Sequence, residues 1–325
     1  MIQEPNQPEI EPTPIDSPTT DNLRPLAPGL YLVGTPIGNL EDITLRALRV
    51  LRSADRIACE DTRQTQKLLN HFSITTPTIS CHQHNERERA IELVAALQSG
   101  QRIALVSDAG MPGISDPGGW LTKAAITAGI TVYPIPGPNA AISALVASGL
   151  PTGEFQFLGF LPEKAGARRT RLESLAHSVA PESSAPDSPI PSRTLIFYEA
   201  PHRILETLTD LESVWGPTLL VVVARELTKM YEEFLRGTVT EVRDVLATRD
   251  RIRGEITLLV EAVPLSPAQR DGSKSLITRL KELESSEGLE EKDALKRLAR
   301  ESGQSKSDLY RELQRERAKG PAKRT

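Results

Sequence analysis

The sequence predicts two α/β domains followed by a helical C-terminal region. Three observations favour this fold class. Short apolar runs alternate with helix-period segments from residue 29 onward, glycine- and proline-rich junctions follow several of these runs, and no β-rich run follows Pro267. The chain has 325 residues, 38% apolar and 25% charged, which is ordinary usage for a globular protein.

The first expected domain spans residues 29–161. Residues 1–28 contain seven prolines and few large apolar residues, so we expect a disordered extension there. The alternation that follows is typical of βαβ units and a mainly parallel sheet. The expected strands are 30–33, 56–59, 78–81, 102–106 and 131–134, and the expected helices are 43–52, 63–72, 86–98 and 139–148.

A second α/β domain is expected over residues 162–264. It is interrupted at 178–192, where four prolines and five serines indicate a disordered surface insertion. Residues 265–325 are expected to form a basic helical tail, in which 291–315 resembles a helix-turn-helix unit with Ser305 as a candidate N-cap. The expected elements of the second domain are strands at 195–198, 219–224 and 255–260 and a helix at 203–211.

Charge is distributed unevenly, although the formal net charge of the whole chain is only −4. Residues 292–325 carry eleven Lys or Arg against five acidic residues, whereas residues 1–28 carry one Arg against five. A basic tail on an acidic body favours a nucleic acid as partner. Charge alone does not distinguish RNA docking from a solvated surface.

Cysteine usage and apolar runs limit the class of protein. Cys59 and Cys81 are too few for a disulfide framework and lack the partners of a zinc site. The longest apolar run, Leu219 to Ala224, is far shorter than the roughly 18 residues of a membrane-spanning helix. No signal pattern opens the sequence. We therefore expect a cytoplasmic protein without a membrane partner.

Two histidines, His82 and His84, are each followed four residues later by a glutamate, Glu86 and Glu88. Both glutamates fall in the first turn of an expected helix, where acidic residues are common without any ligand. We therefore predict no metal.

Three of the expected strands are followed by glycine- and proline-rich junctions: 34–44, 107–119 and 134–141. The longest, SDAGMPGISDPGG, has four glycines and two prolines among thirteen residues, which favours a loop of fixed shape against a ligand. Carboxyl ends of parallel strands share one edge of the sheet, so the three junctions predict one binding cleft. The spacing is not that of a dinucleotide fingerprint, and no Lys indicates a P-loop.

Seven segments between about Leu30 and Val260 resemble, in this order, the motifs of the tetrapyrrole methylase family. ACEDTR, SDAGMPGISDPG and the basic tail resemble the branch of that family that methylates ribosomal RNA rather than corrin precursors. The seven segments are VGTPIGNLEDIT, ACEDTRQTQKLL, SDAGMPGISDPG, PIPGPNAAISAL, FLGFLP, YEAPHR and ARELTKMYEEFLRGT.

The resemblance implies a homodimer that binds S-adenosylmethionine in a cleft between two α/β domains. It implies 2′-O-methylation of a cytidine in 16S rRNA, free or within the small ribosomal subunit. A sulfonium donor carries its own positive charge, so main-chain carbonyls and a carboxylate suit it better than Lys or Arg. When the family's motifs are matched to this sequence, the resemblance implies nine donor contacts: Asp108, Gly110, Pro112, Gly113, Ser115, Pro136, Gly137, Pro138 and Ala140.

A general base must accept the proton of the ribose hydroxyl, and the sequence leaves its identity open. The candidates are Glu60 and Asp61 in CEDTR and Lys229, Glu232 and Glu233 in the segment ELTKMYEEF. For Glu232 and Glu233, a solvated surface pair is an equally good interpretation.

Residues that contact RNA are expected in three places. Arg63 and Arg225 could bind phosphate or orient a carboxylate, and Tyr198, in a segment with His202, could stack on a base or pack in the core. Arg297 and Arg300 belong to the basic tail.

Two other functions stay open: C-methylation of a corrin precursor, and a nucleic-acid-binding regulator without catalysis.

Overall fold

The computed structural model describes residues 25–178, 192–263, 276–302 and 306–318. These residues divide into two compact units after Ala140, and each unit is described by itself. Most of the expected extension at 1–28, most of the insertion at 178–192, and Ser305 lie outside the described residues. Within the described part of the chain, no helix combines the length and apolar character needed to cross a membrane.

A five-stranded parallel sheet forms the centre of the first unit, with strand order β3-β2-β4-β1-β5. All carboxyl ends therefore lie at one edge, and the strands that precede the three predicted junctions, β4, β1 and β5, are neighbours. This arrangement confirms the expected parallel sheet. The strands are β1 (Gly29–Val33), β2 (Arg56–Cys59), β3 (Thr78–Ser80), β4 (Arg102–Val106) and β5 (Val132–Ile135).

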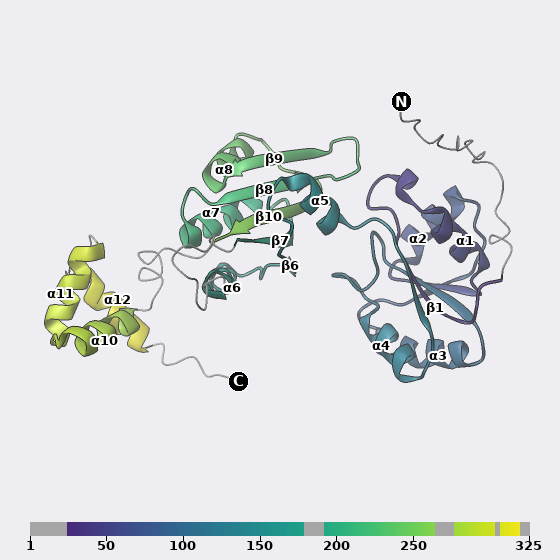
Figure 1. Cartoon of the computed structure of the whole chain (residues 1–325), viewed down its shortest axis with the longest axis horizontal. Coiled ribbons are helices and arrows are strands. Elements are labelled where there is room, and N and C mark those ends of the chain that lie inside the picture. The colour runs from purple at the N-terminus through teal and green to yellow at the C-terminus, as the bar shows by residue number, and fades with distance from the viewer. Residues whose placement is uncertain (1–24, 179–191, 264–275, 303–305, 319–325) are drawn as a thin grey trace, which may run out of the picture. The chain divides into compact units, whose positions relative to one another are not determined.

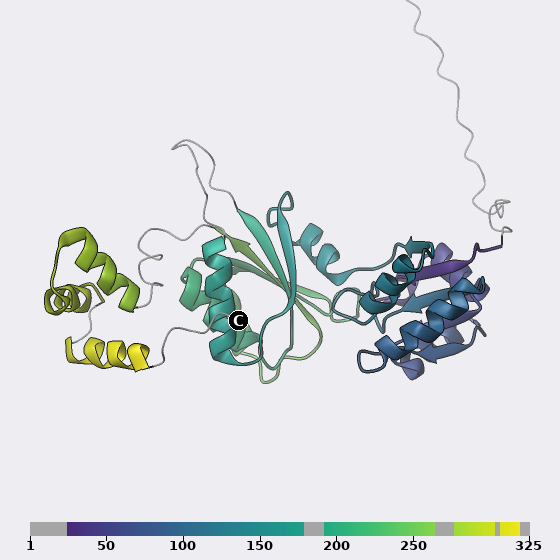
Figure 2. The same ribbon diagram turned by 90° about the horizontal axis from the view of Figure 1, so that it is seen from below.

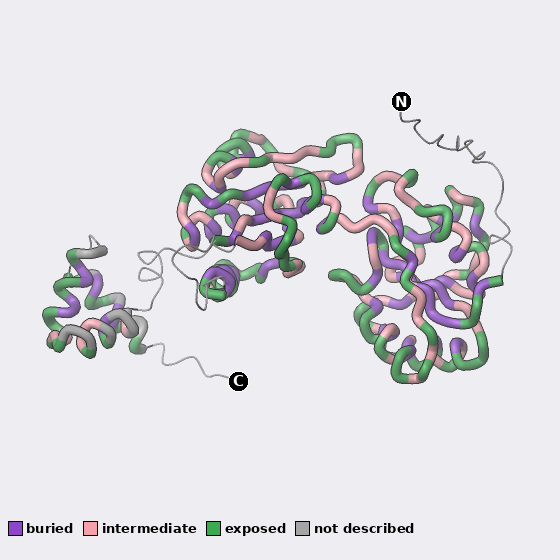
Figure 3. The backbone as a smooth tube through the Cα atoms, in the orientation of Figure 1, coloured by how far each residue is buried: buried purple, intermediate pink, exposed green. Residues whose placement is uncertain are grey.

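Helices cover both faces of this sheet (Figure 1). A short 3₁₀ helix (Leu40–Asp42) follows β1; α1 (Leu45–Ser53) and α2 (Thr62–His71) pack on one face, and α3 (Glu86–Gln98) and α4 (Gly119–Thr127) on the other. The central strands β1, β2 and β4 are consequently buried on both sides, as parallel strands usually are, and are mostly purple in Figure 3, whereas the outer strands β3 and β5 are only partly buried. Buried side chains include Val33, Leu51, Ile57 and Leu69 on the first face and Leu30, Leu93, Ile103 and Leu121 on the second.

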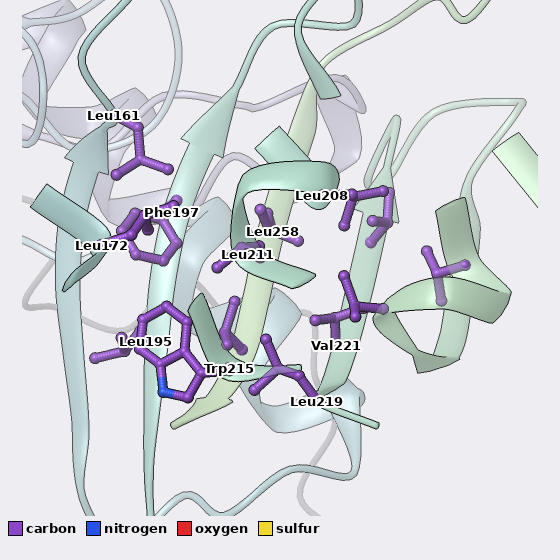
Figure 4. Close-up of a cluster of buried hydrophobic side chains, with 14 of the residues drawn as sticks. Leu161, Leu172, Leu195, Phe197, Leu208, Leu211, Trp215, Leu219, Val221 and Leu258 are labelled. Carbon is purple, nitrogen blue, oxygen red and sulfur yellow. The ribbon is translucent and has the colours of Figure 1, made fainter. Parts of the chain in front are cut away.

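The second unit contains a mixed five-stranded sheet with order β6-β7-β10-β8-β9, in which only β6 and β7 pair in parallel. Its core gathers leucines, valines, Phe197 and Trp215 between the sheet and its helices (Figure 4). The strands are β6 (Phe155–Phe160), β7 (Arg193–Glu199), β8 (Leu220–Arg225), β9 (Glu233–Thr238) and β10 (Ile256–Ala262), and the helices are α5 (Ala140–Ser148), α6 (Ala165–Ser178), α7 (Ile204–Trp215) and α8 (Val239–Ala247).

The division between the two units differs from the expected one at 161/162. Strand β6 pairs with β7, so it belongs to the second sheet. Helix α5 also belongs to the second unit, because Arg236 on β9 donates hydrogen bonds to the carbonyls of Ala147 and Ser148. The third junction ends the first unit rather than continuing it.

Three helices at the C-terminal end, α10 (Leu276–Glu287), α11 (Glu291–Ser302) and α12 (Lys306–Ala318), pack around an apolar core of their own (Figure 2). Helices α11 and α12 correspond to the pair expected over 291–315, and α10 adds a third helix. The core includes Leu280, Ala294, Leu295, Leu298, Leu309 and Leu313.

Candidate active site

The three predicted junctions meet at the carboxyl edge of the first sheet. Thr35, after β1, exchanges two backbone hydrogen bonds with Gly110 in the long loop after β4, at 2.9 and 3.0 Å. The backbones of Gly34 and Gly137 touch, since a Cβ built on Gly34 would lie 2.7 Å from the Cα of Gly137. Only glycine at both positions allows the first and third junctions to approach this closely. The junctions therefore form one rigid rim.

The long loop from Ser107 to Gly118 has a backbone that few sequences could adopt. Gly110, Gly113 and Gly118 have φ of +79°, +83° and +130°, and Ser115 has φ of +60° without being glycine. Such conformations cost energy for residues with a Cβ and occur mainly where the surrounding structure imposes them. The fixed shape that the sequence predicts for this loop agrees with these angles.

Four carboxylates belong to the segments after β2 and β4: Glu60, Asp61, Asp108 and Asp116. Burial raises the pKa of Glu60 above its ordinary value, and the negative charges of Asp116 and Asp108 raise it further. Burial and the charge of Asp108 also keep the pKa of Asp116 raised, against a hydrogen bond from Ser107. The rim is therefore a region of negative potential.

Asp61 has a different environment from Glu60. It caps α2, because its carboxylate accepts a hydrogen bond from the Arg63 N–H at 2.8 Å and pairs with the Arg63 guanidinium at 2.9 Å. These hydrogen bonds lower the pKa of Asp61 to about 2. Its backbone N–H donates to Asp108 at 3.2 Å and so links the end of β2 to the long loop. Asp61 is a poor proton acceptor at neutral pH, and Arg63 is engaged with it.

The far end of the long loop is held by Glu86, the first residue of α3. This side chain is buried, and its Oε1 accepts hydrogen bonds from the N–H groups of Gly118, Trp120 and Leu121 at 3.0, 2.8 and 3.3 Å. Helix α4 begins at Gly119 with a glycine N-cap, so Glu86 supplies the acceptor that the cap lacks.

This rim fits a cationic donor such as S-adenosylmethionine. At Gly34 and Gly137 two main chains meet so closely that no Cβ would fit, so backbone groups form this part of the rim. Segments 34–44, 107–119 and 134–141 contain no Lys or Arg. The carboxylates Glu60, Asp108 and Asp116 repel one another, and a bound positive charge would relieve that repulsion.

In the second unit, the segment after β8 uses its charged side chains to hold a tight turn. Lys229 pairs with Glu226 at 2.9 Å and with Glu255 at 3.0 Å. Burial opposes its charge, yet these hydrogen bonds hold the pKa of Lys229 above its ordinary value. The Glu232 carboxylate accepts a hydrogen bond from the Thr228 N–H at 2.6 Å, which closes the turn.

The turn ends on a second ion cluster. Glu233 pairs with Arg249 at 2.6 Å and Arg225 at 2.9 Å, and hydrogen bonds from Arg249 lower its pKa to about 2. Arg225 also donates to the carbonyls of Tyr231 and Arg253. The predicted catalytic and RNA-binding side chains of this segment are thus engaged in ion pairs and hydrogen bonds within the second unit.

The YEAPHR segment is also largely structural in this geometry. The ring of Tyr198 packs edge-on against Phe157 and Phe160, with ring centroids 5.0 and 5.8 Å apart. Glu199 is buried and accepts hydrogen bonds from the Thr207 hydroxyl and its neighbour's N–H. In the tail, Arg297 and Arg300 are exposed on α11.

Residues 29–243 match the family model described as Tetrapyrrole (Corrin/Porphyrin) Methylases. Ribosomal RNA small subunit methyltransferase I of Halalkalibacterium halodurans is 48% identical over 283 residues, which cover 86% of this chain and 93% of that protein. The protein of the same name from Vibrio cholerae is 52% identical over 235 residues, 72% of this chain and 77% of its own. A crystal structure of the methyltransferase CobJ superposes with a TM-score of 0.52 at 18% identity, covering 73% of this chain and 99% of that one, and shows the fold alone.

The chain belongs to the tetrapyrrole methylase family. The fold-class prediction is confirmed, as are the predictions of a methyltransferase and of S-adenosylmethionine as its methyl donor. The nine predicted donor contacts remain predictions, although Asp108, Gly110, Gly113, Ser115 and Gly137 all belong to the two junctions that meet on the rim.

Two positioning residues of the rim were not among the predicted site residues. Thr35 has no sequence signal, because it contributes through backbone hydrogen bonds to Gly110, 75 positions later. In the sequence, Glu86 resembles an ordinary acidic residue of a first helical turn. The signal that could have identified it is the pair of glycines before Trp120, which leaves α4 without an N-cap side chain.

Proposed function

We propose that this protein transfers a methyl group from S-adenosylmethionine to the 2′-hydroxyl of a cytidine in 16S rRNA of the small ribosomal subunit. The observation that carries this proposal is the likeness to relatives named ribosomal RNA small subunit methyltransferase I, which spans both units. The corrin-precursor alternative is not favoured, since these relatives carry an RNA name at 48% and 52% identity.

Methyl transfer to a ribose hydroxyl is an in-line displacement. The donor supplies an activated methyl group on a sulfonium sulfur, and that S–C bond breaks as the new O–C bond forms. The rim would hold the donor, and alignment of its methyl group with the ribose hydroxyl would lower much of the activation barrier. The proton of the hydroxyl leaves to a base on the protein, so charge balances across the step.

Glu60 is the base that the electrostatics favour. Burial and the neighbouring charges of Asp116 and Asp108 raise its pKa, which makes it a stronger proton acceptor than an ordinary carboxylate. Lys229 is a poor alternative because its ammonium pairs with two carboxylates. Glu232 is committed to the turn.

RNA would approach along α2, directly after Glu60 and Asp61. A shallow groove of about 420 Å³ there is lined by polar and basic side chains, including Arg63 and Lys67. Such side chains suit phosphate oxygens and sugar hydroxyls. The exposed basic residues of α11, Arg297 and Arg300 among them, would add affinity for RNA that does not depend on its sequence.

The test is transfer of a labelled methyl group from S-adenosylmethionine to small subunits and to naked 16S rRNA, with product mapping by resistance to alkaline cleavage. We expect one resistant cytidine with the parent protein and none with Asp108→Ala, because Asp108 joins the loop to the end of β2. Label at a base atom, or donor binding without RNA labelling, would contradict the proposal. Labelling of tetrapyrroles instead would point to the corrin alternative.

A homodimer and a cytoplasmic location remain predictions that accompany this function. Sedimentation of the purified chain at micromolar concentration tests the first, since a dimer has twice the mass of 35.6 kDa.

A further inference from the structure

Glu86 lies at the junction between the long loop and α4. Helix α4 needs acceptors for its first N–H groups, and its N-cap, Gly118, has no side chain and a φ of +130°. One oxygen of Glu86 takes three of these donors, from Gly118, Trp120 and Leu121. The carboxylate comes from another helix, so the contact is tertiary and not a local cap.

The same contact fixes the end of the long loop. A Cβ on Gly118 would lie 2.9 Å from the Cδ2 of Leu105 and 3.4 Å from the backbone N of Gly113, so Gly118 lies close against β4 and the middle of the loop. The N–H of Gly113 in turn donates to the carbonyl of Pro117 at 3.2 Å. A shift at Gly118 therefore reaches Gly113, in the middle of the loop.

The loop has a second anchor at Gly110, where Thr35 forms its backbone bridge. Between the two anchors lie Gly113, Ser115 and Asp116, with positive φ at Gly113 and Ser115. Such backbone conformations persist only where the surrounding structure holds both ends of the loop in place. Since the loop follows β4 and Glu86 belongs to α3, the anchor joins the rim to the helical layer behind it.

We propose that Glu86 is a positioning residue for methyl transfer, whose buried carboxylate holds the long loop in its donor-binding shape without touching the donor. This inference rests on the proposed function of the loop as the S-adenosylmethionine site. A displacement of about 1 Å in a binding loop typically reduces activity on the order of 100-fold.

The matched control is Glu88, which has the same charge in the same first turn of α3 but an exposed side chain. We expect Glu86→Ala to raise the Kd and KM for S-adenosylmethionine about 10- to 100-fold. The KM for the small subunit and the kcat at saturating donor should change much less. Glu88→Ala should leave all four constants near the parent values. Glu86→Gln keeps one acceptor oxygen and should restore most of the donor affinity.

Hydrogen exchange of the donor-free protein supplies a readout that does not need activity. We expect the amides of residues 110–121 to exchange faster in Glu86→Ala than in Glu88→Ala, with unchanged exchange in β2 and β4. An unchanged donor Kd in folded Glu86→Ala, or equal effects of both alanine variants, would overturn the proposal. If Glu86→Ala does not fold, Glu86→Gln decides, because an amide oxygen is a weaker acceptor than a carboxylate. A small loop-specific rise in exchange with a small rise in donor Kd supports a held loop. Exchange and Kd equal to the parent's, or global loosening without a loop-specific change, overturn it.

Failure of the proposed function gives a different pattern. In that case the parent protein methylates no ribose hydroxyl of 16S rRNA, whereas the donor Kd and the loop-specific exchange would still distinguish Glu86→Ala from Glu88→Ala.

Discussion

The carboxylates at the rim of the first unit and those of the turn after β8 in the second unit occupy opposite electrostatic environments. Glu60 follows β2, and Asp108 and Asp116 follow the neighbouring strand β4; burial raises the pKa of Glu60 and Asp116, and the nearby negative charges raise both further. In the second unit, Glu226 and Glu233 each pair with a Lys or Arg within 3 Å, and their pKa values are lowered. Both groups come from equally distinctive sequence motifs.

We infer that this difference separates carboxylates that act on a bound ligand from carboxylates that stabilise the fold. A protein gains no stability from placing like charges together, so an unrelieved cluster on a rigid rim indicates a ligand that carries the opposite charge. Paired charges with lowered pKa values stabilise the folded state instead. Among the four carboxylates after β2 and β4, Asp61 pairs with an Arg, Arg63, and has a lowered pKa, like Glu226 and Glu233.

Removal of the proposed base should have the largest effect. Glu60→Gln is expected to lower kcat about 10²- to 10⁴-fold, because a positioned base contributes that much. For the parent, kcat should fall as pH drops through the raised pKa of Glu60, and this pH dependence should disappear in the variant. Single-turnover methyl transfer between pH 5 and 9 measures both. Asp61→Asn is the neighbouring control, and an equal loss of kcat there would remove the distinction between the two carboxylates.

Loss of the glycine contact on the rim should have the next largest effect. In Gly34→Ala the new Cβ would lie 2.7 Å from the Cα of Gly137 and 2.8 Å from the Met111 sulfur, so the first and third junctions must separate. We expect a loss of about 1–3 kcal/mol in stability and weaker donor binding, measured by chemical denaturation and calorimetry.

Gly119→Ala is the control for this substitution, since nothing lies within 4 Å of a Cβ there. It should leave the Kd unchanged and the stability equal or slightly higher, because alanine favours a helix. If both variants bound the donor equally well, the contact between the junctions would not form the donor site.

The sequence was sufficient to predict the central elements of the fold. The strands expected at 56–59 and 102–106 and the helix at 86–98 match β2, β4 and α3 in every residue. Buried parallel strands carry an apolar run that few other structures require. Strands β6 and β9 were missed because their burial is incomplete: Phe155 and Phe160 are exposed on β6, and β9 has no fully buried residue.

The sequence predicts the parts of the candidate site that depend on local backbone conformation. It does not predict the parts that depend on which charged side chains pair in the folded protein. Glycines and prolines indicated the three junctions, because backbone freedom is a local property. The sequence left Glu60, Asp61, Lys229 and Glu232 equivalent as bases. What separates them is the charge that tertiary structure places beside each, such as Arg63 beside Asp61 and Glu255 beside Lys229.

In the second unit, the ion cluster at Glu233 should affect stability rather than catalysis. Hydrogen bonds from Arg249 lower its pKa from 4.5 to about 2, so it contributes stability above pH 4.5 that is lost as pH falls toward 2. Glu233→Gln is expected to lose about 1–3 kcal/mol at pH 7, and the difference from the parent should shrink between pH 4.5 and 3. Denaturant unfolding at several pH values measures this. A large change in kcat with unchanged stability would assign Glu233 to the chemistry and break the comparison.

The smallest expected effect comes from the basic tail, which carries single exposed charges such as that of Arg300 as well as the ion pair between Arg317 and Glu291 at 3.0 Å. Arg300 is exposed on α11 and has no ion pair among the described residues. Arg300→Ala should weaken binding of 16S rRNA only a few-fold and reduce the slope of log K against log salt by about 1, because one phosphate contact is lost. Donor affinity should not change.

The control for the tail is Lys281→Ala on α10, which removes the same charge from another exposed position. If α11 contacts the RNA directly, only Arg300→Ala changes the salt slope. If the tail acts through its overall charge, both variants change the slope equally, because long-range attraction depends on net charge and not on which helix carries it. The salt slope therefore distinguishes a docking surface from a diffuse field, which the binding constant at a single salt concentration does not.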